Sequence, residues 1–217
     1  MPLPIIPEEL FQVNPDYKVT SFDGDCLIID DFYKNYEEIH SVLISMPVPR
    51  WKTSSTSRNF IDYYDCRPVI NNPCPQEGYF NYLKTLGSFL RYFKDTSVYE
   101  EDSMNYTFNY YKNIKTNVSN SLQHMPHIDM AYNVIVYLDK ICSGGTALYN
   151  IPAPVNTESE NLLYDVSNVE KVVINAVPNR LVMFRGNKTH GGYIEDHTKY
   201  ENDWRINQVK FLQERKS

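Results

Sequence analysis

The segment HMPHIDM, residues 124 to 130, holds a histidine and an aspartate with one residue between them. In an extended backbone, side chains two positions apart lie on the same face, so His127 and Asp129 can point toward one position in space. An imidazole nitrogen and a carboxylate oxygen suit a first-row divalent metal ion. Two ligands bind a metal only weakly, and a His-x-Asp pair also arises by chance in polar loops. The metal interpretation therefore requires a third ligand elsewhere in the chain.

His190 is the best-placed candidate for that third ligand. It follows the apolar run RLVMF and lies in GNKTHGGY, where Gly191 and Gly192 allow the backbone to come close to a ligand. Two histidines and one aspartate form the facial triad of non-haem Fe(II) oxygenases, which leaves three coordination positions open. The other histidines have no such context: they are His40 in a predicted helix, His124 in the loop near the pair, and His197.

Two amphipathic helices are expected in the first half of the chain. The short buried strand CLIID (26–30) precedes the first helix, which Asp30 or Asp31 can cap and Pro47 ends. A second helix is expected from about 75 to 93. The apolar face of the first helix comprises Phe32, Tyr36, Ile39, Leu43 and Met46, which recur at spacings of three and four.

From residue 104 the sequence pattern changes to a period of two, which is typical of β-strands. Helices first and short strands later indicate an α+β fold or a β-barrel with a helical flank. One side of these strands is apolar enough to lie under the helices, and the other carries polar residues that could line a pocket. The strand-like segments are MNYTFNYY (104–111), YNVIVYLD (132–139), GTALYN (145–150), RLVMFRG (180–186) and RINQVKFL (205–212).

The composition limits the class of protein. The 217 residues are enough for one domain with one sizeable core. With 21 Lys and Arg against 27 Asp and Glu the net charge is -6, which disfavours a general binder of nucleic acid. No run of about 18 apolar residues exists, so no membrane span is expected, and the N-terminus lacks the features of a signal peptide. The four cysteines form no CxxC pair and are interpreted as free thiols of a reducing compartment, which predicts a cytoplasmic protein.

Several separated segments, in a fixed order, resemble the Fe(II)/2-oxoglutarate-dependent dioxygenases, in particular their prolyl-hydroxylase-like branch. HID resembles the HxD motif of the family, and VIVYLDK followed by SGGTALY resembles its apolar strand and Gly-Gly turn. PNRLVMFRGNKTHGG resembles the strand that leads to the distal histidine, and WRINQVKFL resembles the last core strand with its basic residue. LIIDDFYKNYEEIHSVL, far upstream, resembles the strand and helix that open many of these enzymes.

The resemblance implies a mostly β fold with flanking helices (α+β). This fold is a double-stranded β-helix, or cupin-like jelly roll, with the N-terminal helices packed on its larger sheet. It implies one domain over residues 1–217, with a strand-helix flank over 1–100 and a jelly-roll core over 104–212. Residues 151–179 would form either a lid or substrate wall, or a surface insertion.

The resemblance also assigns site residues. Arg205 would hold the distal carboxylate of 2-oxoglutarate, because a guanidinium can bind a carboxylate through two hydrogen bonds; a surface charge is the alternative. Tyr137 and Tyr111 would contact the same co-substrate, with a plain core role as the alternative for both. The Fe(II) ligands would be His127, Asp129 and His190.

The chemistry of the family implies a dioxygenase that uses Fe(II), 2-oxoglutarate and O2, with ascorbate as a possible reductant. It would release succinate and CO2 and hydroxylate a substrate such as a protein proline or a small metabolite. Asp129 is intact, whereas halogenating relatives have Gly or Ala there, so the hydroxylase type is expected. Nucleic acid is disfavoured as a substrate, since no second arginine follows Arg205 at the spacing of the base-demethylating branch. The alternative is a catalytically inactive jelly roll that only binds a ligand.

Overall fold

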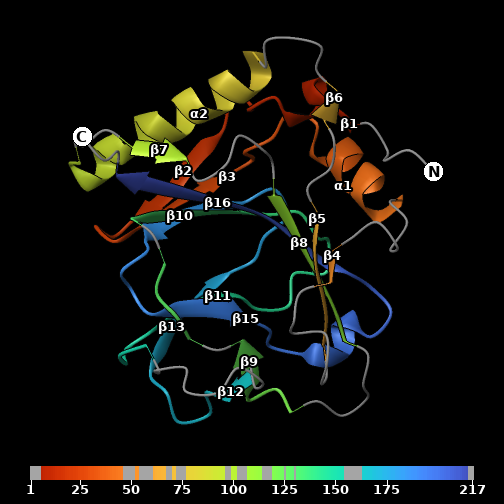
Figure 1. Ribbon diagram of the computed structural model, residues 1–217, viewed down its shortest axis with the longest axis vertical. Coiled ribbons are helices and arrows are strands. Elements are labelled where there is room, and N and C mark those ends of the chain that lie inside the picture. Colours follow the sequence, from red (N-terminus) through yellow and green to blue (C-terminus); the bar gives the residue numbers. More distant parts are fainter. Residues whose placement is uncertain are drawn as a thin grey trace.

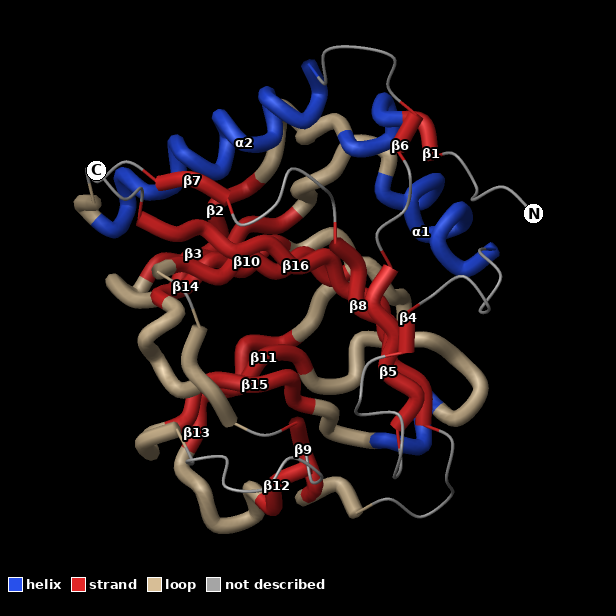
Figure 2. Tube along the Cα trace, viewed as in Figure 1, coloured by secondary structure: helices blue, strands red, loops and turns tan. Residues whose placement is uncertain are grey.

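The described part of the molecule consists of two facing β-sheets, with helices α1 (Tyr36–Ser45) and α2 (Glu77–Phe89) on the outer side of the larger sheet (Figure 1). Figure 2 shows helices, larger sheet and smaller sheet as successive layers. None of the described helices is long and apolar enough to cross a membrane. This computed structural model describes residues 6–45, 52–53, 61–66, 70–71, 77–95, 99–101, 107–113, 119–124, 126–129, 131–153 and 163–214.

The larger sheet is antiparallel in its described pairings. Near its centre β10 and β16 lie side by side, in register from Tyr132 opposite Leu212 to Tyr137 opposite Asn207. The strand order is β2 (Lys18–Phe22), β3 (Cys26–Asp30), β14 (Leu181–Arg185), β10 (Tyr132–Tyr137), β16 (Arg205–Glu214), β8 (Thr107–Asn113), β5 (Ile61–Cys66) and β4 (Lys52–Thr53), and β7 (Tyr99–Glu101) also pairs with β16.

The smaller sheet faces the centre of the larger one. Its strands lie in the order β13 (Lys171–Asn175), β11 (Gly145–Tyr149) and β15 (His190–Tyr193). Two further strand pairs are β9 (Leu122–His124) with β12 (Leu163–Asp165), and β1 (Ile6–Pro7) with β6 (Ile70–Asn71). Short 3-10 helices are η1 (Glu8–Phe11), η4 (Leu90–Phe93) and η5 (His197–Tyr200).

The main hydrophobic core fills the space between the helices and the larger sheet. Alternation along each strand decides which side chains enter it: Val134 and Val136 of β10 face this core, whereas Asn133, Ile135 and Tyr137 face the smaller sheet. Burying one such aliphatic or aromatic side chain stabilises the fold by about 1.5–3 kcal/mol. The buried members of this core include Phe32, Ile39, Leu43, Tyr82, Leu86, Phe89, Tyr132, Leu181, Met183 and Ile206.

The interior between the two sheets is partly apolar and partly polar. Tyr137, Val182 and Phe184 belong to a second buried cluster there. Next to it lie Asn133 and Arg205, which are 2% and 6% exposed. Burying polar groups costs free energy unless they find partners, so this polar part of the interior is where a ligand site is expected.

The predicted strands agree with the structure to within one or two residues at most ends. CLIID coincides with β3, the three segments from 132 to 186 contain β10, β11 and β14, and the segment 205–212 covers β16 except for its last two residues. The predicted strand 104–111 corresponds to β8, and its residues 104–106 lie outside the described residues. Two facing antiparallel sheets with helices on the outer side confirm the predicted jelly roll.

The first predicted helix begins later than its apolar pattern indicated. Asp31 has a left-handed backbone, with φ of 58°, so the helix cannot include it. Asn179 then holds the next two residues: its C=O accepts from the N–H of Phe32 at 3.0 Å, and its Oδ1 accepts from the N–H of Tyr33 at 2.7 Å. Helix α1 therefore starts at Tyr36, although Phe32 still enters the core.

The second predicted helix is divided into two parts. Helix α2 runs over Glu77–Phe89, and the chain tightens into the 3-10 helix η4 over Leu90–Phe93. Pro75, Met46 and Pro47, which entered the helix predictions, lie outside the described residues.

Neither aspartate proposed as a helix cap has that role. Asp30 lies at the end of β3 and accepts two hydrogen bonds from Arg180, from Nε at 2.6 Å and from Nη2 at 3.0 Å. This pair is mostly buried, whereas Asp31 pairs with Lys18 on the surface at 2.8 Å. The hydrogen bond from Arg180 holds the pKa of the Asp30 carboxyl below its usual range.

Asp30→Asn should lower the free energy of unfolding by about 1–3 kcal/mol at pH 7, the contribution of a charge-assisted hydrogen bond. Because the folded-state pKa is lowered, this stabilisation is present above the ordinary carboxyl pKa of about 3.9 and is lost as the pH falls through the folded value. Urea unfolding at pH 7 and pH 3 should show the difference from the parent shrinking in acid. Asp31→Asn removes an exposed ion pair and should lower the free energy of unfolding only slightly at either pH. If Asp30→Asn lowers the free energy of unfolding by the same amount at pH 7 and pH 3, the ion pair of Asp30 with Arg180 is not the source of the stabilisation.

Candidate metal centre

Two reciprocal backbone hydrogen bonds bring His127 and His190 opposite each other. The N–H of each residue donates to the C=O of the other at 2.8 Å, which forms an isolated antiparallel bridge at the start of β15. Directly opposed residues of an antiparallel pair carry their side chains on the same face. The two imidazole rings lie 4.5 Å apart between centroids.

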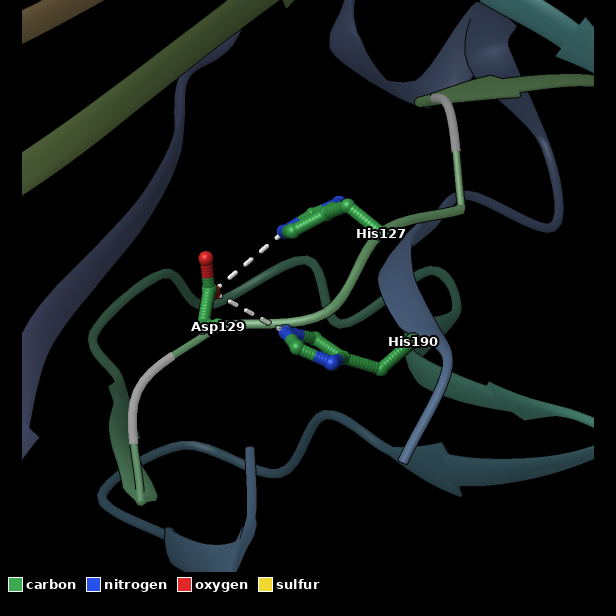
Figure 3. A group of neighbouring side chains, drawn as sticks. All are labelled: His127, Asp129 and His190. Carbon is green, nitrogen blue, oxygen red and sulfur yellow. Dashed lines mark hydrogen bonds and ion pairs between the residues drawn. The ribbon is translucent and has the colours of Figure 1, made fainter. Parts of the chain in front are cut away.

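Asp129 joins the two histidines. Its backbone N–H donates to the C=O of Gly186 at 2.9 Å, which fixes the residue beside the turn after β14. Its Oδ2 lies 3.4 Å from Nε2 of His127 and 3.2 Å from Nε2 of His190, and Figure 3 shows both rings directed toward this carboxylate. The three candidate ligand atoms lie within 4.8 Å of one another. Neighbouring ligands of an octahedral ion at about 2.1 Å are about 3 Å apart, so small side-chain rotations bring the three atoms to one ion.

The backbone sets the tautomer of His190. Nδ1 lies 2.8 Å from the C=O of Lys188, and a carbonyl oxygen can only accept a hydrogen bond. Nδ1 therefore carries a proton, which leaves Nε2 as the ring nitrogen that can bind a metal ion. This is the arrangement in which histidines bind metals, with the second ring nitrogen held by a carbonyl.

The electrostatics of the cluster keep Asp129 ionised. Partial burial alone would raise the pKa of its carboxyl, but hydrogen bonds and charge interactions with His127 and His190 outweigh burial and hold this pKa well below the usual range. An ionised carboxylate beside two imidazoles is a donor set for a divalent cation.

Arg205 begins β16 and faces the interior between the sheets. It is 6% exposed, and its Nη2 donates to the C=O of Gly145 at 2.7 Å. Its Nε is buried and has no hydrogen-bond partner in the described part of the chain. The alternative of a surface charge is therefore wrong, because this guanidinium lies inside the fold with unused donor capacity.

Of the two predicted tyrosines, Tyr137 can be located in detail. It is fully buried, and its hydroxyl lies 2.6 Å from Oγ1 of Thr146. Burial raises the pKa of this hydroxyl to about 12, although the charge of Arg205 acts in the opposite direction. Tyr111 pairs with Arg205 between strands β8 and β16, and its side chain lies outside the described residues.

Glycines allow the strands to approach around Arg205. A Cβ on Gly145 would lie 1.9 Å from the C=O oxygen of Ile174, so no other residue fits there without a shift. Gly144 has φ of +89°, which favours glycine. Gly192 is different: a Cβ there would meet only Nη1 of Arg205, at 3.6 Å.

The remaining histidines are not brought into the cluster. The ring of His124 contacts that of His127, with centroids 5.2 Å apart. His197 is buried, and its Nε2 bonds to the C=O of Leu122 at 2.9 Å. His40 lies in α1 beside Tyr36.

The segment 151–179 contributes to the sheets where it is described. Residues 163–165 form β12, and residues 171–175 form β13 at the edge of the smaller sheet. This part is integral to the jelly roll rather than a separate lid.

One buried residue of the site has no signal in the sequence analysis. Asn133 lies on β10 beside Asp129 and His190, and it is the polar member of an inward-facing row that continues with Ile135 and Tyr137. The alternation of β10 places it inward, but only the fold shows what it contacts.

Comparisons with known proteins identify the fold. No protein-family model and no curated protein matches this sequence. An oxidoreductase of the 2OG-Fe(II) oxygenase family from Burkholderia pseudomallei matches with a TM-score of 0.53 over 90% of this chain and 92% of that chain, at 12% identity. The chain has the fold of the 2OG-Fe(II) oxygenases. The epimerase SnoN, in complex with Fe3+, alpha ketoglutarate (2-oxoglutarate) and nogalamycin RO, gives a TM-score of 0.53 over 88% of this chain and 79% of that chain, at 8% identity.

The 2OG-Fe(II) oxygenase fold confirms the resemblance drawn from the separated sequence motifs. At 8 to 12% identity the likeness extends to the fold.

Gly145→Ala should destabilise the protein by about 1–3 kcal/mol or more, because the added methyl group overpacks against the backbone of β13. Chemical denaturation measures the loss. Gly87→Ala in α2 is the matched control, since a Cβ there meets nothing within 4 Å, and it should be neutral or stabilising by about 0.5–1 kcal/mol. Equal stability of the two variants would contradict the close approach of the strands.

Proposed function

We propose that this protein is a Fe(II)- and 2-oxoglutarate-dependent dioxygenase of the hydroxylase type. The observation that carries the proposal is the pairing of two features inside one oxygenase fold. A His-Asp-His cluster gathers at one position that is partly open to solvent, and a buried guanidinium with an unpartnered Nε lies inside the fold. A module that only binds a ligand has no need for both.

The donor set fits a hydroxylase-type iron centre. His127, Asp129 and His190 would hold Fe(II) through two imidazole nitrogens and one carboxylate oxygen and would leave three positions open. Bound Fe(II) would supply dioxygen activation coupled to oxidative decarboxylation of 2-oxoglutarate to succinate and CO2. The ring of Phe184, 4.8 Å from that of His190 between centroids, excludes water from one side of the cluster.

The spacing along β15 supports a dicarboxylate site between the cluster and Arg205. His190 and Gly192 are two positions apart on β15, which is a rise of about 6–7 Å. Because Gly192 has no side chain, no β15 side chain at this position lies between His190 and Nη1 of Arg205. Arg205 would bind the distal carboxylate of 2-oxoglutarate, and the hydroxyl of Tyr137 would support the same end.

Hydroxylation is proposed because Asp129 is present as a third ligand, which argues against halogenation. The substrate we propose is a protein side chain such as proline or a small metabolite. The acidic net charge of -6 disfavours nucleic acid.

The proposed activity is tested by incubating the protein with Fe(II), ascorbate, 2-oxoglutarate and air. We expect slow decay of 2-oxoglutarate with formation of succinate even before the primary substrate is found. Asp129→Ala should abolish this turnover without unfolding the protein, because it removes one metal ligand from a half-exposed segment. If 2-oxoglutarate binds to the Fe(II) protein and never decays, the ligand-binding alternative is correct.

Arg205→Ala should weaken 2-oxoglutarate binding by one to two powers of ten, which corresponds to roughly 1.5–3 kcal/mol for a charge-assisted hydrogen bond. Titration of 2-oxoglutarate into the anaerobic Fe(II) protein, followed by the metal-to-ligand absorption band, measures the affinity. Arg180→Ala is the control, because it removes an arginine whose partner is Asp30. Unchanged affinity in Arg205→Ala would remove Arg205 from the co-substrate site.

A further inference from the structure

Asn133 is a buried amide in direct contact with the metal cluster. It is 2% exposed and lies on β10, one strand from the segment that carries Arg205. Its Nδ2 lies 3.1 Å from Oδ2 of Asp129 and 2.7 Å from Nε2 of His190.

The chemistry of its neighbours fixes the orientation of this amide. Oδ2 of Asp129 is a carboxylate oxygen, which accepts hydrogen bonds, and it lies 3.1 Å from the amide group. The NH2 group must therefore face Asp129, and Oδ1 must face away. Oδ1 is buried and has no hydrogen-bond partner among the described residues.

A buried amide with an unpartnered oxygen is unfavourable for folding. The other inward-facing residues of β10, Ile135 and Tyr137, pack in an apolar cluster, where an aliphatic residue would serve the fold better than asparagine. The two NH2 contacts therefore indicate that Asn133 serves the site rather than the packing of the core.

We propose that Asn133 is a positioning residue of the metal centre, which orients Oδ2 of Asp129 toward the bound ion. This inference rests on the metal site proposed above. A bound ion would take the single lone pair of His190 Nε2, so the hydrogen bond to His190 cannot coexist with metal ligation. The hydrogen bond to Asp129 can, because a carboxylate oxygen has more than one lone pair. Asn133 therefore acts on the metal through Asp129.

Hydrogen-bond partners of metal ligands typically change the metal affinity by about 10- to 100-fold when they are removed. Asn133→Leu keeps a side chain of similar size and lacks the donor. We expect it to bind Co(II) or Mn(II) about 10-fold or more weakly than the parent, measured by calorimetry and by the visible absorption of the Co(II) protein. Asn133→Val, which suits a strand and has no side-chain donor, should weaken binding as well and serves if Asn133→Leu does not fold.

Gln208→Leu is the matched control. Gln208 is also a buried amide, on the adjacent strand β16, and it too has an unpartnered atom, Nε2. Its Oε1 accepts from the hydroxyl of Tyr33 on the helix side of the sheet. Gln208→Leu should alter the unfolding temperature but leave the metal affinity as in the parent.

A double-mutant cycle tests whether Asn133 affects metal affinity through Asp129. In an Asp129→Ala background, Asn133→Leu should cause no further loss of Co(II) affinity, since the residue that it orients is gone. Equal affinity of the parent and Asn133→Leu, or the same loss in both backgrounds, would overturn the positioning role while leaving the metal site intact. A parent protein that binds neither Co(II) nor Mn(II) would overturn the metal site and this role together.

Discussion

The reciprocal pair of backbone hydrogen bonds between His127 and His190 is the constraint on which the site depends. It is isolated, and it ties the segment before β10 to the first residue of β15. Both histidine side chains are thereby directed to one position, one from the segment before β10 and the other from β15. The backbone bond from Asp129 to Gly186 then fixes the third residue relative to β14. Ligand geometry thus comes from main-chain pairing, which is more rigid than surface side chains.

The two faces of the larger sheet differ in polarity: the outer face contributes mainly to stability, and the inner face carries the polar residues of the candidate site. Its outer face lies under α1 and α2 and is mostly apolar, with Val134, Met183 and Ile206 among its members, although Gln208 is also buried there. Its inner face carries buried polar atoms that have no hydrogen-bond partner among the described residues, such as Nε of Arg205 and Oδ1 of Asn133. The large apolar core offsets the free energy that these groups cost, as expected where a fold maintains a binding site.

Local patterns in the sequence allowed much of the site to be predicted, and long-range contacts account for the rest. The same-face relation of His127 and Asp129 spans two residues, and strand periodicity is equally local. The helix cap proposed for Asp30 failed because its carboxylate pairs with Arg180, 150 residues further along the chain. Asn133 was not found for a different reason: strand alternation places it inward, but only the fold shows that its amide contacts Asp129 at 3.1 Å.

Strand β16 is the last strand along the described chain, yet it lies between β10 and β8 in the larger sheet. A ribosome delivers the chain from its N-terminus, so β10 and β14 can pair early, whereas β8 has no neighbour on the β10 side until residues 205–214 emerge. Closing a sheet through such distant pairings is slow and leaves strand edges open to association with other chains. The first residue of β16 is Arg205. The guanidinium of Arg205 therefore enters the interior when β16 pairs with β10 and β8 and joins the two halves of the sheet.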